Sequence, residues 1–190
     1  MKTILIDVDD VICTNHFVPV VNMYLNKNYV EDDFKNVKIE LELFPDEDER
    51  FKFLEYYASL DSYQYSFLKK DAYSVLERLV KQNNVILVTS ACHYEQSLMM
   101  GRQFTDKWNF LLSKLPFLPP ENIIFSNQKH LIKGDIMIDD RVEHLKGDFK
   151  HKFLFTCFHN KDIPDSELEK NNITRAKDWN HLAKLINSLT

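Results

Sequence analysis

Short hydrophobic runs recur along the chain and predict buried β-strands. The first covers residues 4–6, and an acidic stretch follows it directly. Four more runs come later in the chain, at residues 85–88, 122–125, 136–138 and 153–156. Apolar residues hardly alternate with polar ones in these runs, so each strand should be covered on both faces. This pattern is typical of a parallel sheet.

Between the predicted strands, apolar residues recur at the spacing of an amphipathic helix. Two such patterns are clear, one at Ala72, Val75, Leu76, Leu79 and Val80 and one at Leu182, Leu185, Ile186 and Leu189. Strands that alternate with helices indicate an α/β fold, here with a five-stranded parallel sheet. The connection from about residue 123 to 136 is short for a helical crossover.

Residues from about 13 to 70 break this alternation, because they are rich in aromatic and acidic side chains and contain no comparable strand. The sequence Phe44-Pro45-Asp46 predicts the start of a helix over residues 47–58, since proline and acidic residues favour a first helical turn. We therefore expect a core domain of residues 1–14 and 71–190. A small helical cap of residues 15–70 would be inserted after the first strand.

Composition limits the classes of function. The chain has 44% hydrophobic residues and a formal net charge of -5, which fits a globular protein and argues against binding to long nucleic acid. No apolar run approaches the roughly 18 residues of a membrane span, and no signal-peptide pattern is present, so we expect a cytoplasmic location. Three glycines are too few for a glycine-rich phosphate loop. Cys13, Cys92 and Cys157 suggest buried thiols rather than disulfides or a zinc site.

Polar groups follow four of the predicted strands, at the end where α/β proteins bind ligands. They are Asp7-Val8-Asp9-Asp10, Thr89-Ser90, Lys129 and Asp139-Asp140-Arg141. Each group has a simpler reading when taken alone: turn residues, a helix N-cap, a solvated surface lysine and a surface salt-bridged turn. Their ordered occurrence at strand ends instead predicts one catalytic site.

Phosphoryl transfer assigns a role to each member of this set. Converging carboxylates repel one another unless a hard cation neutralises them, which predicts Mg²⁺ held by Asp7, Asp140 and the backbone carbonyl of Asp9. Asp7 would be the nucleophile, and Asp9 would act as general acid and base. Asp9 would also lie against the phosphate, with the remaining phosphate contacts from Thr89, Ser90 and Lys129.

A receiver domain also combines acids, a threonine and a lysine at the ends of parallel strands. There the acid pair precedes the phosphorylated aspartate, the threonine and the lysine. In this chain Lys129 precedes the second acid pair, and a long insertion follows the first strand. The order and the length therefore exclude a receiver domain.

The motifs resemble the haloacid dehalogenase superfamily, and more narrowly its 5'(3')-deoxyribonucleotidases. Lys129 stands ten residues before Asp139, in a stretch that ends Ile138-Asp139-Asp140-Arg141. Residues 154–160, Leu-Phe-Thr-Cys-Phe-His-Asn, are similar to the family's fifth-strand segment, and Asp178-Trp179 to the start of its final helix. The family usually has glycine where Asp10 stands and proline where Ala91 stands.

This resemblance implies a Rossmann-like core with a helical cap, and an aspartyl-phosphate intermediate on Asp7. It also implies that nucleoside monophosphates are dephosphorylated, with 2'-deoxy uracil or thymine nucleotides preferred, and that the protein is a homodimer. The base would lie against aromatic rings of the cap, for which the candidates are Phe17, Tyr63, Tyr65 and Phe67.

Two other functions remain open at this stage. One is a phosphatase for another small phosphomonoester, because the core motifs do not read the leaving group. The other is a non-catalytic, metal-dependent nucleotide-binding or regulatory module.

Overall fold

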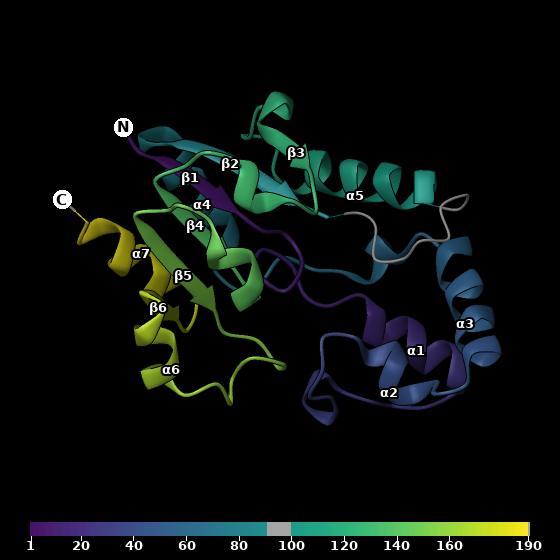
Figure 1. The fold of residues 1–190 in the computed structure, drawn as a ribbon. Helices are drawn as coiled ribbons and strands as arrows, with labels where there is room; N and C mark the ends of the chain where they lie inside the picture. Colours follow the sequence, from purple (N-terminus) through teal and green to yellow (C-terminus); the bar gives the residue numbers. More distant parts are fainter. Residues whose placement is uncertain (91–99, 190) are drawn as a thin grey trace.

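A six-stranded parallel sheet forms the centre of the protein, in the strand order β3-β2-β1-β4-β5-β6 (Figure 1). The structure is a computed structural model, and it describes residues 1–90 and 100–189. The strands are β1 (Thr3–Ile6), β2 (Asn84–Thr89), β3 (Ile123–Phe125), β4 (Ile136–Asp139), β5 (His151–Phe155) and β6 (Ile173–Ala176). The α/β fold with a parallel sheet is confirmed.

The predicted count of five strands is wrong, because β6 was not recognised. This strand lies at the edge of the sheet and pairs with β5 alone. Its sequence Ile-Thr-Arg-Ala places two polar residues in the middle, and only Ile173 and Ala176 are buried. An edge strand exposed in this way lacks the continuous apolar run that identified the others.

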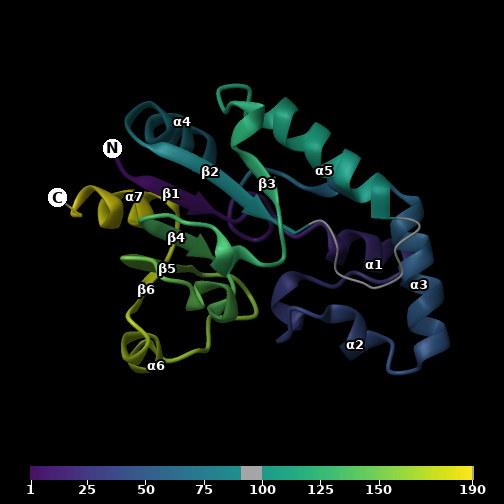
Figure 2. The same ribbon diagram turned by 45° about the horizontal axis from the view of Figure 1, so that its top comes forward.

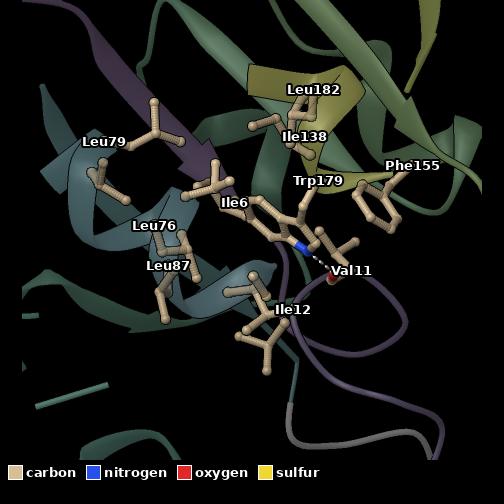
Figure 3. Close-up of a cluster of buried hydrophobic side chains, with 14 of the residues drawn as sticks. Ile6, Val11, Ile12, Leu76, Leu79, Leu87, Ile138, Phe155, Trp179 and Leu182 are labelled. Atoms are coloured by element: carbon tan, nitrogen blue, oxygen red, sulfur yellow. Dashed lines mark hydrogen bonds between the residues drawn. The ribbon is translucent and has the colours of Figure 1, made fainter. Parts of the chain in front are cut away.

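Helices cover both faces of the sheet. Residues of β1 alternate between the faces, so that Ile4 and Ile6 belong to one hydrophobic cluster and Leu5 to another. The first cluster includes side chains of α4 (Ala72–Gln82), α5 (Met100–Lys114) and α7 (Trp179–Asn187). The second includes side chains of η6 (Val142–Lys146) and α6 (Asp165–Lys170). Figure 3 shows the first cluster around Trp179, whose indole N–H donates to the carbonyl of Val11 at 2.9 Å.

The connection from β3 to β4 contains no α-helix, as its length predicted. It carries one short 3-10 helix, η5 (Lys129–Leu131), whereas η4 (Pro120–Asn122) precedes β3. β4 pairs with β1 rather than with β3, so this segment spans the width of two strands. The first residue of η5 is Lys129, which therefore lies near the end of β1.

The insertion after β1 is helical and has its own hydrophobic cluster. Its elements are α1 (Phe17–Leu25), η1 (Glu31–Asp33), α2 (Ile39–Leu43), α3 (Glu47–Ser59) and η2 (Ser62–Tyr65). The predicted start of α3 is confirmed, since Asp46 caps it by accepting the N–H of Glu49 at 3.0 Å. The strand arrowheads point toward these helices (Figures 1 and 2). The domain boundaries, and a role for the insertion as a cap, stay predictions.

Several features outside the sheet bear on the other expectations. In the described part of the chain, no helix is both long and apolar enough to cross a bilayer. Cys13 and Cys157 are free and buried, as expected. Cys92 lies outside the described residues, and so does Ala91, where the similar family usually has proline.

Candidate active site

The carboxyl ends of the three central strands bring the predicted residues to one edge of the sheet. Ile6 lies beside Leu87 of β2 and beside Ile138 of β4. The chain continues this pairing for one more residue, since the N–H of Asp7 donates to the carbonyl of Ile138 at 2.9 Å. Parallel register therefore places Asp7 near the last residues of β2 and β4.

Lys129 is buried and bridges two carboxylates. Its Nζ lies 2.8 Å from Oδ1 of Asp7 and 2.7 Å from Oδ2 of Asp139, and 1% of the residue is exposed. Burial alone would lower the pKa of Lys129, but the charges of Asp7 and Asp139 hold it above its usual value. A solvated surface lysine is excluded.

The acid pair at the end of β4 is buried as well. Asp139 also accepts from the backbone N–H of Arg141 at 2.9 Å, and its Oδ1 lies 3.0 Å from Nδ1 of His144. Asp140 lies 2.7 Å from Nε2 of His159. Burial, with the charges of Asp139 and Asp7, raises the pKa of Asp140 well above its usual range. A surface salt-bridged turn is therefore excluded here.

Asp9 is held by a second lysine, Lys107, which the sequence patterns did not single out. Nζ of Lys107 lies 2.6 Å from Oδ2 of Asp9 and 2.8 Å from Oγ1 of Thr89, and it also donates to the carbonyl of Ser90. The hydroxyl of Tyr63 donates to the other oxygen of Asp9 at 2.7 Å. Burial raises the pKa of Asp9, but Lys107 outweighs it and holds this pKa below its usual value.

A signal for Lys107 does exist in the helical periodicity of α5. Leu111 is buried one turn further along, and Phe110 is buried three residues on. Lys107, with 1% exposed, thus occupies a core-facing position where an apolar residue would be usual. A lysine on the buried face of a helix needs a carboxylate partner, and Lys107 lies on a helix rather than at the end of a strand.

Asp10 has an unusual backbone conformation. Its φ is 57°, in the left-handed region that favours glycine, which gives a physical reason for the glycine usually present there in the similar family. Its Oδ2 accepts from the side chain of Asn15 at 3.1 Å, and its Oδ1 is buried with no hydrogen-bond partner in the described chain. Burial raises the pKa of Asp10 to about 7.

A pocket of about 290 Å³ opens at this edge of the sheet. Of the predicted site residues, its wall includes Asp7, Asp9, Ser90, Lys129, Asp140 and Phe17. The predictions did not include several other residues that line it: Asp10, Asn15, His16, Val37, Lys38, Glu40, Tyr57, Asn127, Arg141 and His144. The pocket therefore lies between the strand ends and the inserted segment.

Four predicted residues are not among the described residues of the pocket wall. Thr89 is fully buried behind Lys107. Tyr63 is buried against Asp9, and Tyr65 packs on the aromatic cluster of the insertion. Phe67 is 66% exposed. Their contact with a substrate stays a prediction.

The charges around Lys129 fit a divalent cation. Asp7, Asp139 and Asp140 gather around this one lysine, which pairs with two of them. Asp139 is further occupied by His144 and by a backbone N–H, whereas Asp7 and Asp140 both line the pocket. Carboxylate oxygens are the ligands that Mg²⁺ prefers. Asp7 and Asp140 are therefore the side chains that could hold this ion, and the backbone carbonyl of Asp9 stays the predicted third ligand.

Comparisons with solved structures support the fold. A haloacid dehalogenase-like hydrolase from Streptococcus pneumoniae superposes with a TM-score of 0.59 at 14% identity, covering 97% of this chain and 98% of that chain. A hydrolase from Pseudomonas syringae superposes with a TM-score of 0.56 at 13% identity, with full coverage of both chains. At these identities the likeness concerns the fold alone.

Sequence comparisons are more specific. A 5'(3')-deoxyribonucleotidase of Clostridium acetobutylicum is 36% identical over 118 residues, which cover 62% of this chain and 57% of that protein. One of Bacillus subtilis is 30% identical over 110 residues, covering 58% and 56%. The chain thus spans little more than half the length of these relatives. The family described as 5' nucleotidase, deoxy (pyrimidine), cytosolic type C protein matches residues 1–189. The chain belongs to this family of nucleotidases.

Proposed function

We propose that this protein is a phosphatase that removes phosphate from nucleoside monophosphates through an aspartyl-phosphate on Asp7. The observation that supports the proposal is that Asp7 and Asp9 lie in the same pocket, each beside a lysine. Both line one pocket, and each is held by its own buried lysine, Lys129 or Lys107. A nucleophile and a proton carrier fixed at one site are what this chemistry requires.

In the first step, a carboxylate oxygen of Asp7 attacks phosphorus and the bond to the leaving oxygen breaks. Lys129 orients Asp7 and offers positive charge to the phosphoryl oxygens. The leaving oxygen takes a proton from Asp9. In the second step, Asp9 takes a proton from water, which attacks phosphorus, frees inorganic phosphate and restores Asp7.

Lys107 sets the state of Asp9 before the substrate binds. Its ammonium group favours the ionised carboxylate, which suits the second step but not the first. A substrate phosphate that accepts a hydrogen bond from Lys107 would weaken this hold and let Asp9 carry a proton. Tyr63 keeps Asp9 in place meanwhile, through the hydrogen bond to its other oxygen.

The residues around Asp7 fit Mg²⁺ as the cofactor. Asp7, Asp140 and the backbone carbonyl of Asp9 would hold the ion, which when bound neutralises the carboxylates and polarises the phosphate. Asp139 would not be a ligand of the ion, because its oxygens already contact Lys129, His144 and the N–H of Arg141. It would instead help to position Lys129.

The names of the relatives support a deoxyribonucleotide as substrate. Phe17 and Tyr57 line the pocket on the side of the insertion and offer ring surface to a flat base. The volume of about 290 Å³ suits a small ligand. The homodimer implied by the resemblance, and the cytoplasmic location expected from the absence of a signal-peptide pattern, belong to this same proposal.

A substrate panel tests the proposal. With Mg²⁺ present, we expect dUMP and dTMP to be hydrolysed at least about tenfold faster, in kcat/KM, than ribonucleotides or sugar phosphates. Equal rates for sugar phosphates would favour a phosphatase for another small phosphomonoester. No phosphate release from any substrate, in a protein that still binds dUMP, would favour the non-catalytic module.

A further inference from the structure

Three side chains next to the pocket offer one oxygen, one sulfur and one nitrogen to a common point. Asp140 follows β4, while Cys157 and His159 lie in the loop after β5. The carboxylate oxygen, the Sγ and the imidazole nitrogen all lie within 4.8 Å of one another. The mechanism described above uses Asp140 but neither Cys157 nor His159.

The loop that carries this cluster is held in place by Asn160. The side-chain N–H groups of Asn160 donate to the carbonyl of Asp140 at 2.7 Å and to the carbonyl of Phe155 at 2.8 Å. Its side-chain oxygen accepts the N–H of Cys157 at 3.1 Å. Asn160 thus ties the ends of β4 and β5 together, so the three ligand groups are fixed before any ion arrives.

Asp140 and Cys157 are buried, and His159 is partly buried. Cys157 is 8% exposed and Asp140 4%, and the His159 side chain is 8% exposed, with its Nε2 2.7 Å from Oδ2 of Asp140. A tetrahedral zinc ion keeps its sulfur, nitrogen and oxygen ligands about 3.3 to 3.7 Å apart. The three ligand atoms lie within 4.8 Å of one another, so small side-chain movements would bring them to this geometry.

We infer that Asp140, Cys157 and His159 form a second metal site, which takes Zn²⁺ or another borderline-soft divalent ion. A thiolate and an imidazole select zinc or cobalt over magnesium, which prefers oxygen ligands. As the ion binds, the thiol proton of Cys157 and the proton shared by Asp140 and His159 pass to solvent. Three protein ligands leave a fourth position open to water.

Asp10 provides an independent sign that the place suits a cation. Its side chain is 4% exposed, and its Oδ1 has no hydrogen-bond partner in the described chain. Asp10 and Asp140 line the same pocket. A divalent ion at this place would neutralise both buried carboxylates.

This site would compete with catalysis, because it shares Asp140 with the proposed magnesium site. An ion bound to Cys157 and His159 withdraws Asp140 from the pocket, so zinc should inhibit and excess Mg²⁺ should relieve the inhibition. The inhibition rests on the proposed function, whereas the binding of zinc or cobalt does not.

Titration of the metal-free protein with Co²⁺ tests the site without any substrate. We expect a sulfur-to-cobalt charge-transfer band in the near ultraviolet that saturates at one ion per chain. Cys157→Ser should abolish this band, and Cys13→Ser, which alters the other buried thiol of the described chain, should keep it. The absence of the band in the unaltered protein, or its persistence in Cys157→Ser, would overturn the inference.

Binding of Zn²⁺ measured by calorimetry gives a second readout. We expect the loss of the thiolate in Cys157→Ser, or of the imidazole in His159→Gln, to weaken Zn²⁺ binding by about tenfold or more. The zinc concentration that halves Mg²⁺-dependent hydrolysis should rise in parallel. If cobalt and zinc bind as predicted but no substrate is hydrolysed, the metal site stands and the proposed function fails. Unchanged zinc affinity in both folded variants would contradict the site.

Discussion

The two lysines of the site hold their carboxylates in different surroundings. Lys129 lies among Asp7, Asp139 and Asp140, all 8% or less exposed in their side chains. Among the described residues, the carboxylate that pairs with Lys107 is that of Asp9, whose side chain is 24% exposed and also accepts a hydrogen bond from Tyr63. Lys129 therefore lies among more buried carboxylates than it can neutralise. Lys107 neutralises one carboxylate, which also accepts a hydrogen bond from Tyr63.

This difference separates the two chemical roles. Around Lys129 the surplus of carboxylates favours a divalent cation, and Asp7 stays fixed toward the pocket. Around Lys107 the positive charge of the lysine is matched by the negative charge of Asp9. A substrate phosphate that binds Lys107 would therefore change the protonation of Asp9. The nucleophile therefore lies in a rigid environment, and the proton carrier lies where a substrate phosphate can change its state.

Removal of the nucleophile should have the largest effect. We expect Asp7→Asn to lower kcat by at least about 10⁴-fold, because the amide cannot form the aspartyl-phosphate. Steady-state phosphate release from dUMP measures this, with circular dichroism as the control for folding. Substantial residual activity in the folded variant would sink the covalent mechanism.

Removal of each lysine should destabilise the protein unequally. Lys129→Met leaves two buried carboxylates without their partner, so we expect the free energy of unfolding to fall by about 3 to 5 kcal/mol. Lys107→Met should cost less, about 1 to 3 kcal/mol, because Asp9 is more exposed and keeps Tyr63. Urea unfolding in buffer with a chelator measures both. Equal losses, or a larger loss for Lys107→Met, would contradict the comparison.

Asp10 should make stability depend on pH. Its pKa is raised to about 7 in the folded protein, so the folded state binds more protons than the unfolded state between about pH 4 and 7. Stability from this group is therefore present at low pH and lost as pH rises through 7. In metal-free buffer, Asp10→Asn should match the unaltered protein near pH 4 and exceed its unfolding free energy by about 1 to 3 kcal/mol at pH 8. A constant difference across this range would argue against the buried carboxylate.

The smallest effect should come from Tyr63. Tyr63→Phe removes one hydrogen bond to Asp9, so we expect kcat/KM for dUMP to fall by about three- to tenfold. Tyr73→Phe is the matched control, because this tyrosine on α4 is 43% exposed and outside the site, so kcat/KM should change by less than about twofold. An equal loss in Tyr73→Phe would contradict a specific role for the hydrogen bond from Tyr63 to Asp9.

Five of the six strands, and the site residues at the strand ends, could be predicted from the sequence. Buried strands give continuous apolar runs, and parallel register then brings Asp7, Lys129 and Asp140 together without further information. Edge strand β6 was missed because its two middle residues, Thr174 and Arg175, are polar and interrupt the apolar run. The helical sides of the pocket could not be predicted in the same way.

Lys107 and the inserted segment show why. Whether a helical lysine reaches Asp9 depends on how α5 packs on the sheet, which the local sequence does not specify. Contact of the predicted aromatic side chains with the base stays a prediction; Tyr65 packs in the aromatic cluster of the insertion, and the hydroxyl of Tyr63 donates to Asp9. Phe17 is the one predicted ring among the described residues of the pocket wall.

Trapping of the phosphoenzyme tests the central claim most directly. Asp9→Asn should still accept the phosphoryl group on Asp7 but hydrolyse it slowly, because the amide cannot activate water. After incubation with dUMP and Mg²⁺, peptide mass spectrometry of this variant should find a phosphoryl adduct on Asp7 that is absent in the double variant with Asp7→Asn. If the unaltered protein is active but neither it nor Asp9→Asn ever carries phosphate on Asp7, the covalent mechanism is contradicted and direct attack by water is favoured.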